Sequence, residues 1–207
     1  MLIKIENELP VGFPILEDNF RYMFPSEVFP LVLTPEIVEP FGYGMYDFSQ
    51  VPSLQWNQRA EEGVPEKDVF NIWRQKWNVI TLEGQELADR FAEIKAKVNQ
   101  DINRWRLIAN TSYFTHETKQ FDCDALSRSD IDGISTYVSL YGVLPPTFPG
   151  GWKAKDNSIF SIPDVETWKQ FISSMVAAGT ANFVKAQTLK AQLNAATTYE
   201  EIMTLEW

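Results

Sequence analysis

The chain has 207 residues, of which 44% are apolar and 28 are aromatic, and a net charge of −10. This composition is typical of a folded chain with real cores and excludes a mainly disordered one. The single cysteine, Cys123, excludes a disulfide framework. No apolar run approaches the ~18 residues that span a bilayer, and the acidic charge disfavours nucleic acid, so we expect neither a membrane nor a nucleic-acid partner.

Proline recurs throughout residues 1–52. Because proline removes a backbone donor, this stretch is expected to form short extended pieces joined by turns. The strand candidates are Leu2–Ile5, Phe20–Phe24, Phe29–Leu33 and Tyr43–Phe48. Thr34 followed by Pro35 is typical of a helix N-terminus, and Pro40 ends that helix after about one turn.

Residues 53–80 have the pattern of a β-hairpin, with arms near 54–60 and 69–80 and a turn over 61–68. Alternation in the second arm places Trp73 and Trp77 on one face. A lone hairpin is marginal in water, so we expect it to pack on the earlier strands. Residues 1–80 are therefore predicted to be a small, mainly antiparallel β unit.

A long helix is predicted over residues 81–110, with Thr81 as its cap. About 28 residues of helix at 1.5 Å each would be roughly 42 Å long, which suits a connecting helix. Its apolar side chains repeat every three or four residues along one face. The stripe consists of Leu87, Phe91, Ile94, Val98, Ile102 and Trp105, continuing to Ile108. We favour packing within the chain over self-association as a homo-oligomer, because uneven steps break a coiled-coil heptad.

Residues 111–207 are predicted to form helices with two short β-hairpins, one over Tyr113–Asp122 and one flanking residues 155–158. A first helix is capped by Ser127 and ends at Gly142, and a second is capped by Asp164. Thr198 opens a capping box for a last helix that runs to the end of the chain. The predicted fold class is α+β, divided into residues 1–80, 81–110 and 111–207.

No catalytic, cofactor or metal site is predicted. His116 is the only histidine and lies in a predicted exposed turn, so neither a Ser/His/Asp nor a Cys/His arrangement is favoured. Acidic residues gather between Asp122 and Asp132, but Gly133 is misplaced for a calcium loop. We interpret these acids as helix N-terminal residues. No spacing selects a carboxylate pair for glycoside cleavage.

Aromatic side chains are abundant between residues 13 and 77. Most are expected to build the core of the small β unit, with some left for a protein partner; a glycan-binding surface is the alternative. The candidate partner-binding rings are Phe20, Phe24, Phe29, Tyr43, Tyr46, Trp73 and Trp77.

Residues 100–207 resemble a phage-encoded domain of unknown function. That domain commonly lies at the C-terminus of proteins encoded beside tail-fibre genes. The residues that carry this resemblance are Phe121–Asp124, Ser127-Arg128, Trp152–Asn157, Leu189–Thr198, Glu200-Glu201 and Trp207. The first half of the chain is similar to the N-terminal part of phage tail-fibre assembly chaperones. There the residues are Phe41-Gly42-Tyr43, Trp73–Val79 and Thr81-Leu82-Glu83.

This resemblance implies a non-catalytic chaperone, without cofactors, that binds the C-terminal region of a phage tail-fibre protein. It would assist folding or trimerisation in the host cytoplasm by covering the unpaired strand edges of the fibre protein until those strands pair. One alternative is a structural virion component, a baseplate or fibre-tip subunit that stays in the tail. Another is a glycan-active or glycan-binding protein of the fibre tip.

Overall fold

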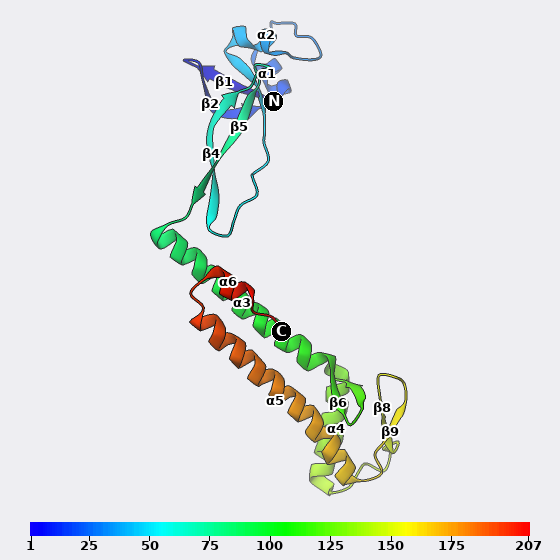
Figure 1. Cartoon of the computed structure of the whole chain (residues 1–207). Coiled ribbons are helices and arrows are strands. Elements are labelled where there is room, and N and C mark those ends of the chain that lie inside the picture. The colour runs from blue at the N-terminus through cyan, green and yellow to red at the C-terminus, as the bar shows by residue number, and fades with distance from the viewer. The chain divides into compact units, whose positions relative to one another are not determined.

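The computed structural model describes all 207 residues, and the chain divides into two compact units, residues 1–88 and 89–207 (Figure 1). Both helices and strands are present, which confirms the α+β class. The boundary falls within the long helix α3 (Gly84–Ser112). Most of this helix therefore belongs to the same unit as the C-terminal helices and is not a separate connecting element.

The first unit is built on one five-stranded sheet, in the order β2-β1-β3-β5-β4. Neighbouring strands in this sheet pair antiparallel, except β3 and β5, which pair parallel. The strands are β1 (Leu2–Glu6), β2 (Leu9–Ile15), β3 (Tyr43–Asp47), β4 (Gln58–Lys67) and β5 (Trp73–Thr81). The order leaves β2 and β4 as the two edges of the sheet.

Between β2 and β3 the chain forms helix α1 (Glu17–Met23), an irregular loop, helix α2 (Pro35–Val38) and the 3₁₀ turn η1 (Glu39–Phe41). The predicted strands Phe20–Phe24 and Phe29–Leu33 are therefore wrong. Helical spacing brings the rings of Phe20 and Phe24 to one face, 5.1 Å apart, where they enter an aromatic cluster. Phe29 joins the same cluster from the loop, also 5.1 Å from Phe20.

The β4–β5 hairpin is confirmed, but its turn lies at residues 68–72 and not at 61–68. Gly63 and Pro65 belong to β4, where the register shifts between Gly63 and Glu66. Glycine and proline are tolerated at such an irregularity on an edge strand. The Asp68 carboxylate organises the true turn by accepting hydrogen bonds from the N–H groups of Phe70 and Ile72.

The second unit combines two long helices with two hairpins. After α3 come β6 (Tyr113–His116), β7 (Lys119–Asp122), α4 (Ala125–Tyr141), β8 (Gly151–Lys153), β9 (Ile159–Ser161), α5 (Val165–Ala195) and α6 (Tyr199–Met203). Helix α5 runs back beside α3, and α6 lies against this pair (Figure 1). Both predicted hairpins are confirmed.

Helix ends follow their capping residues. Asp164 caps α5, and Thr198 with Glu201 forms a complete capping box at α6, as predicted. The cap of α4 is Asp124 rather than Ser127, whose N–H donates to the Asp124 carboxylate at 2.9 Å. Thr81 is not a cap, because it ends β5. Helix α6 ends at Met203, before the end of the chain.

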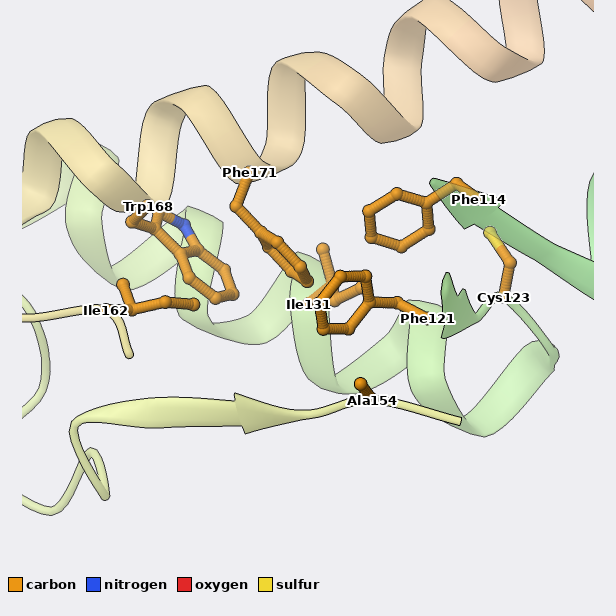
Figure 2. Close-up of a cluster of buried hydrophobic side chains, with 8 residues drawn as sticks. All are labelled: Phe114, Phe121, Cys123, Ile131, Ala154, Ile162, Trp168 and Phe171. Carbon is orange, nitrogen blue, oxygen red and sulfur yellow. The ribbon is translucent and has the colours of Figure 1, made fainter. Parts of the chain in front are cut away.

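Two cores stabilise the second unit. In one, both hairpins, α4 and the start of α5 enclose a cluster around Phe171, which is fully buried (Figure 2). Phe114, Phe121 and Trp168 surround its ring. The other lies between α3, α5 and α6. Its buried members are Ile102, Ala186, Leu189, Leu193, Ala196 and Ile202.

Candidate partner-binding surface

Most of the seven rings predicted to face a partner belong to the interior of the first unit. Phe20, Tyr43, Tyr46 and Trp73 are at most 9% exposed. Phe24, Phe29 and Trp77 are half-buried. Phe24 and Phe29 pack against the Phe20 cluster, and the Trp77 indole N–H donates to the Ser49 carbonyl at 3.2 Å. Six of the seven rings belong to the buried clusters of the first unit, and the predicted ring surface is corrected for these six. Trp77 belongs to neither cluster.

Trp73 is held where the parallel strands β3 and β5 meet. Gly44 on β3 lies directly against the indole, and a Cβ atom there would collide with the ring. The neighbouring ring of Tyr46 is 2% exposed, and this burial, with a smaller effect from Glu62, raises the pKa of its phenol. Both side chains therefore support the sheet instead of offering a contact surface.

Other apolar side chains of the first unit are exposed. Seven large ones are at least 70% exposed: Phe13, Tyr22, Val28, Leu31, Val32, Val69 and Phe70. In the second unit only Leu126 and Leu140 reach that level. Large exposed apolar groups that gather in one place mark interaction sites in soluble proteins. Four of the seven lie in helix α1 and the loop that follows it.

Arg21 fixes this loop on helix α1. Its guanidinium donates to the backbone carbonyls of Phe29, Pro30 and Leu31, with the shortest distance 2.7 Å to Pro30. The inner side of the segment is anchored by the buried rings of Phe20 and its neighbours. The exposed apolar side chains of the same segment include Leu16, Tyr22, Val28, Leu31 and Val32. We call these five residues, with Glu17, Asp18 and Glu27, the α1–loop surface.

The first unit carries most of the chain's net negative charge. Residues 1–88 contain six Lys or Arg against fourteen Asp or Glu, a net charge of −8, and only −2 of the chain's −10 lies on residues 89–207. Arg21 is the only basic residue between Lys4 and Arg59. Sequence reasoning missed the α1–loop surface, although this lone arginine in a long acidic and apolar stretch was a usable signal.

The apolar stripe of α3 packs within the chain. Ile102 is fully buried, and Phe91, Ile94, Val98 and Trp105 pack against the core shared with α5 and α6. Leu87 lies in the first unit and is half-buried. Hydrogen bonds from Lys95 to the Asn194 carbonyl and between Asn110 and Asn182 reinforce the α3–α5 contact. From Phe91 to Trp105 the stripe is thus covered by the chain's own helices, whereas Ile108 at its end is 57% exposed.

A groove of about 800 Å³ lies between the later half of α3 and the middle of α5. Its walls are mainly apolar, with Trp105 and Ile108 on one side and Ala178 and Ala181 on the other. Trp207 also lines it, beneath the Lys185 ammonium, which lies 5.1 Å from the ring centroid. No charged side chain lines this groove.

His116 is buried rather than exposed in a turn. It is 7% exposed and is the last residue of strand β6, so the predicted position in an exposed turn is wrong. Its Nδ1 lies 2.8 Å from the Ser174 hydroxyl, and the rings of Phe160 and Phe171 meet it edge-on. The preceding alternation explains the burial, because Phe114 and His116 lie on the same inward face of the strand.

Of the acidic residues near 122–132, only Asp124 acts at a helix N-terminus, so the interpretation from the sequence is corrected for the others. Asp122 ends β7 and pairs with Lys155, and Asp130 and Asp132 lie beyond the first turn of α4. The Ser127 N–H donates to the Asp124 carboxylate and, with lesser contributions, holds its pKa below the ordinary value. No group of three or more His, Cys, Asp or Glu residues in the structure is placed to hold a metal ion. No helix combines the length and the apolar character needed to cross a bilayer.

Comparison with known families gives one match. Residues 93–206, more than half of the chain and almost all of the second unit, match a family described as a domain of unknown function, DUF4376. No curated protein and no solved structure matches the chain.

Proposed function

The chain belongs to the family DUF4376, a domain of unknown function, and from that premise we propose that it is a non-catalytic assembly chaperone for a phage tail fibre. It binds the C-terminal region of the fibre protein in the host cytoplasm and assists folding or trimerisation. The first unit makes the contact, and the DUF4376 domain forms the rest of the molecule.

The observation that carries this proposal is the exposed apolar surface of the first unit. Tyr22, Val28 and Leu31 are 86%, 98% and 93% exposed, although the same segment contributes Phe20 to a buried cluster. Leaving such side chains in water brings no folding energy, whereas covering apolar area stabilises a complex by roughly 25 cal/mol per Å². A helper that shields the apolar segments of an unfinished fibre needs a surface of this kind.

The two edge strands favour partner contact through side chains over the addition of a partner strand to the sheet. The edge strand β2 contains Pro10 and Pro14, which lack the N–H groups that a new strand requires. The other edge, β4, is interrupted by a register shift and carries ion-paired charges such as Glu66 with Lys76. Both edges have features that discourage pairing with another strand.

Co-expression tests the proposal. The fibre protein is produced with and without this chain, and soluble trimer is measured by native gel and analytical ultracentrifugation. We expect soluble trimer only, or mainly, in the presence of the chain. Equal trimer yield in both cultures would contradict the chaperone function.

Mass spectrometry of purified virions separates a released helper from a virion part. We expect the chain to be absent from the particle. Stoichiometric presence would contradict release and would indicate a baseplate or fibre-tip subunit.

A further inference from the structure

The α1–loop surface is a pre-formed face with two layers. Phe20, Phe24 and Phe29 anchor it from below through ring contacts of about 5 Å. The Arg21 guanidinium fixes the loop by three carbonyl contacts, so the outer apolar groups are held in place before any partner arrives. A pre-organised face loses less conformational entropy on binding than a disordered one.

The charges on this face have no partner within the chain. Glu17, Asp18 and Glu27 form no ion pair, whereas Glu39 and Asp47 elsewhere in the unit are paired with Lys67 and Arg74. The one basic residue of the segment, Arg21, is directed to backbone carbonyls. The segment of residues 16–32 therefore combines exposed apolar groups with a net charge of −2, because three acids outnumber the single Arg21.

From this combination we infer that the α1–loop surface binds a basic amphipathic polypeptide segment, in which Lys or Arg alternates with apolar side chains. The apolar groups of that segment cover Tyr22, Val28 and Leu31, and its cations meet Glu17, Asp18 and Glu27. A second copy of this chain is a poor occupant, because its first unit carries the same net charge of −8. The inference rests on the proposed function and names the chemistry of the fibre segment.

The first experiment measures binding of a synthetic probe to the full chain by calorimetry. The probe is an amphipathic peptide of Lys and Leu, and its counterpart has Glu at every Lys position. We expect the Lys peptide to bind and the Glu peptide not to bind. Affinity for the Lys peptide falls severalfold between about 50 mM and about 500 mM NaCl, because salt screens surface charges. Equal binding of both peptides would overturn the inference.

An apolar variant locates the site. The combined changes Tyr22→Ser, Val28→Ser and Leu31→Ser are expected to weaken binding of the Lys peptide at least tenfold, with the circular dichroism spectrum retained. The matched control replaces Tyr141, Leu126 and Leu140 by Ser, because these side chains are also exposed but lie on the second unit. An equal loss of affinity in the control would assign the peptide to non-specific apolar contact and overturn the site.

A charge variant tests the second half of the inference. Glu17→Gln, Asp18→Asn and Glu27→Gln together are expected to lower affinity and to flatten its salt dependence. The control neutralises three acids of the second unit that are exposed and form no ion pair, with Glu117→Gln, Asp130→Asn and Asp132→Asn. If both variants weaken binding equally, the attraction comes from net charge alone and the assigned site is wrong.

Failure of this inference is distinguishable from failure of the proposed function. If the wild-type chain rescues fibre trimer and the Tyr22, Val28 and Leu31 variant rescues it equally, the function stands and the surface is wrong. If the wild-type chain gives no rescue, the function fails, while peptide binding still decides the site. Analytical ultracentrifugation of the wild-type chain and the apolar variant tests a second copy as the occupant. A wild-type dimer that is lost in the apolar variant would assign the surface to a second copy and overturn the inference.

Discussion

Phe171 shows how much one side chain contributes to the second unit. Its ring is fully buried and lies 5.0 Å from Phe114, 4.8 Å from Phe121 and 5.7 Å from Trp168. The change Phe171→Ala leaves a cavity among three rings that cannot easily collapse, so we expect a loss of about 3–5 kcal/mol in unfolding free energy by urea titration. Phe171→Leu fills most of the space and should lose clearly less. Equal losses would show that packing there is loose.

Asp68 gives the first unit a pH-dependent contribution to stability. Desolvation opposes the charge, but hydrogen bonds from Ile72, Arg74 and Phe70 outweigh it and hold the pKa of Asp68 below 3.8. A carboxyl group whose folded pKa is lowered stabilises the fold above its unfolded pKa and loses that contribution as the pH falls through the folded value.

Asp68→Asn tests this sign. We expect the variant to melt at a lower temperature than the wild type near neutral pH, and the difference to shrink once the pH falls well below 3.8. Thermal unfolding followed by circular dichroism across the acid range measures it. If the melting temperatures of the variant and the wild type differ equally at neutral and at acid pH, the Asp68 carboxylate does not stabilise the turn through its charge.

Residue-scale burial was the least predictable property of the sequence. Phe20 and Tyr22 lie two positions apart, yet Phe20 is fully buried and Tyr22 is 86% exposed. Their difference depends on contacts with Phe41 and Tyr43, more than eighteen positions along the chain. Composition and spacing show that rings are abundant, but they do not show which rings those distant contacts cover.

At the scale of elements, helix ends carry a local signal that was predictable. Thr198 and Glu201 bond reciprocally to each other's backbone N–H groups, as their spacing indicates. Turn residues were harder to interpret: Gly63 and Pro65 lie inside an edge strand, whereas the true turn depends on Asp68 and on Asn71, whose φ is +61°. Asp and Asn three positions apart were the better turn signal.

Helix α6 holds Ile202 in the core between α3 and α5, so its cap affects the unit. Thr198→Ala removes the acceptor for the Glu201 N–H and is expected to lower unfolding free energy by about 1 kcal/mol. Thr198→Ser keeps the acceptor and should remain close to the wild type. Urea titration of the full chain measures both variants, and equal loss in the two would show that the hydroxyl is not the stabilising group.

At the scale of the whole molecule, the division into two units predicts separate folding. The second unit has two buried clusters of its own, and the DUF4376 match begins at residue 93. A fragment of residues 84–207, which starts with α3, is expected to give a helical circular dichroism spectrum and one cooperative urea transition. A fragment that unfolds without cooperativity would contradict this division.

We propose that the chain acts by binding the fibre protein through the α1–loop surface. Hydrogen–deuterium exchange of the full chain, alone and with the C-terminal region of the tail-fibre protein, tests it most directly. We expect slower exchange across residues 16–32, with α4 unchanged. No change in exchange anywhere, or protection confined to the second unit, would contradict it.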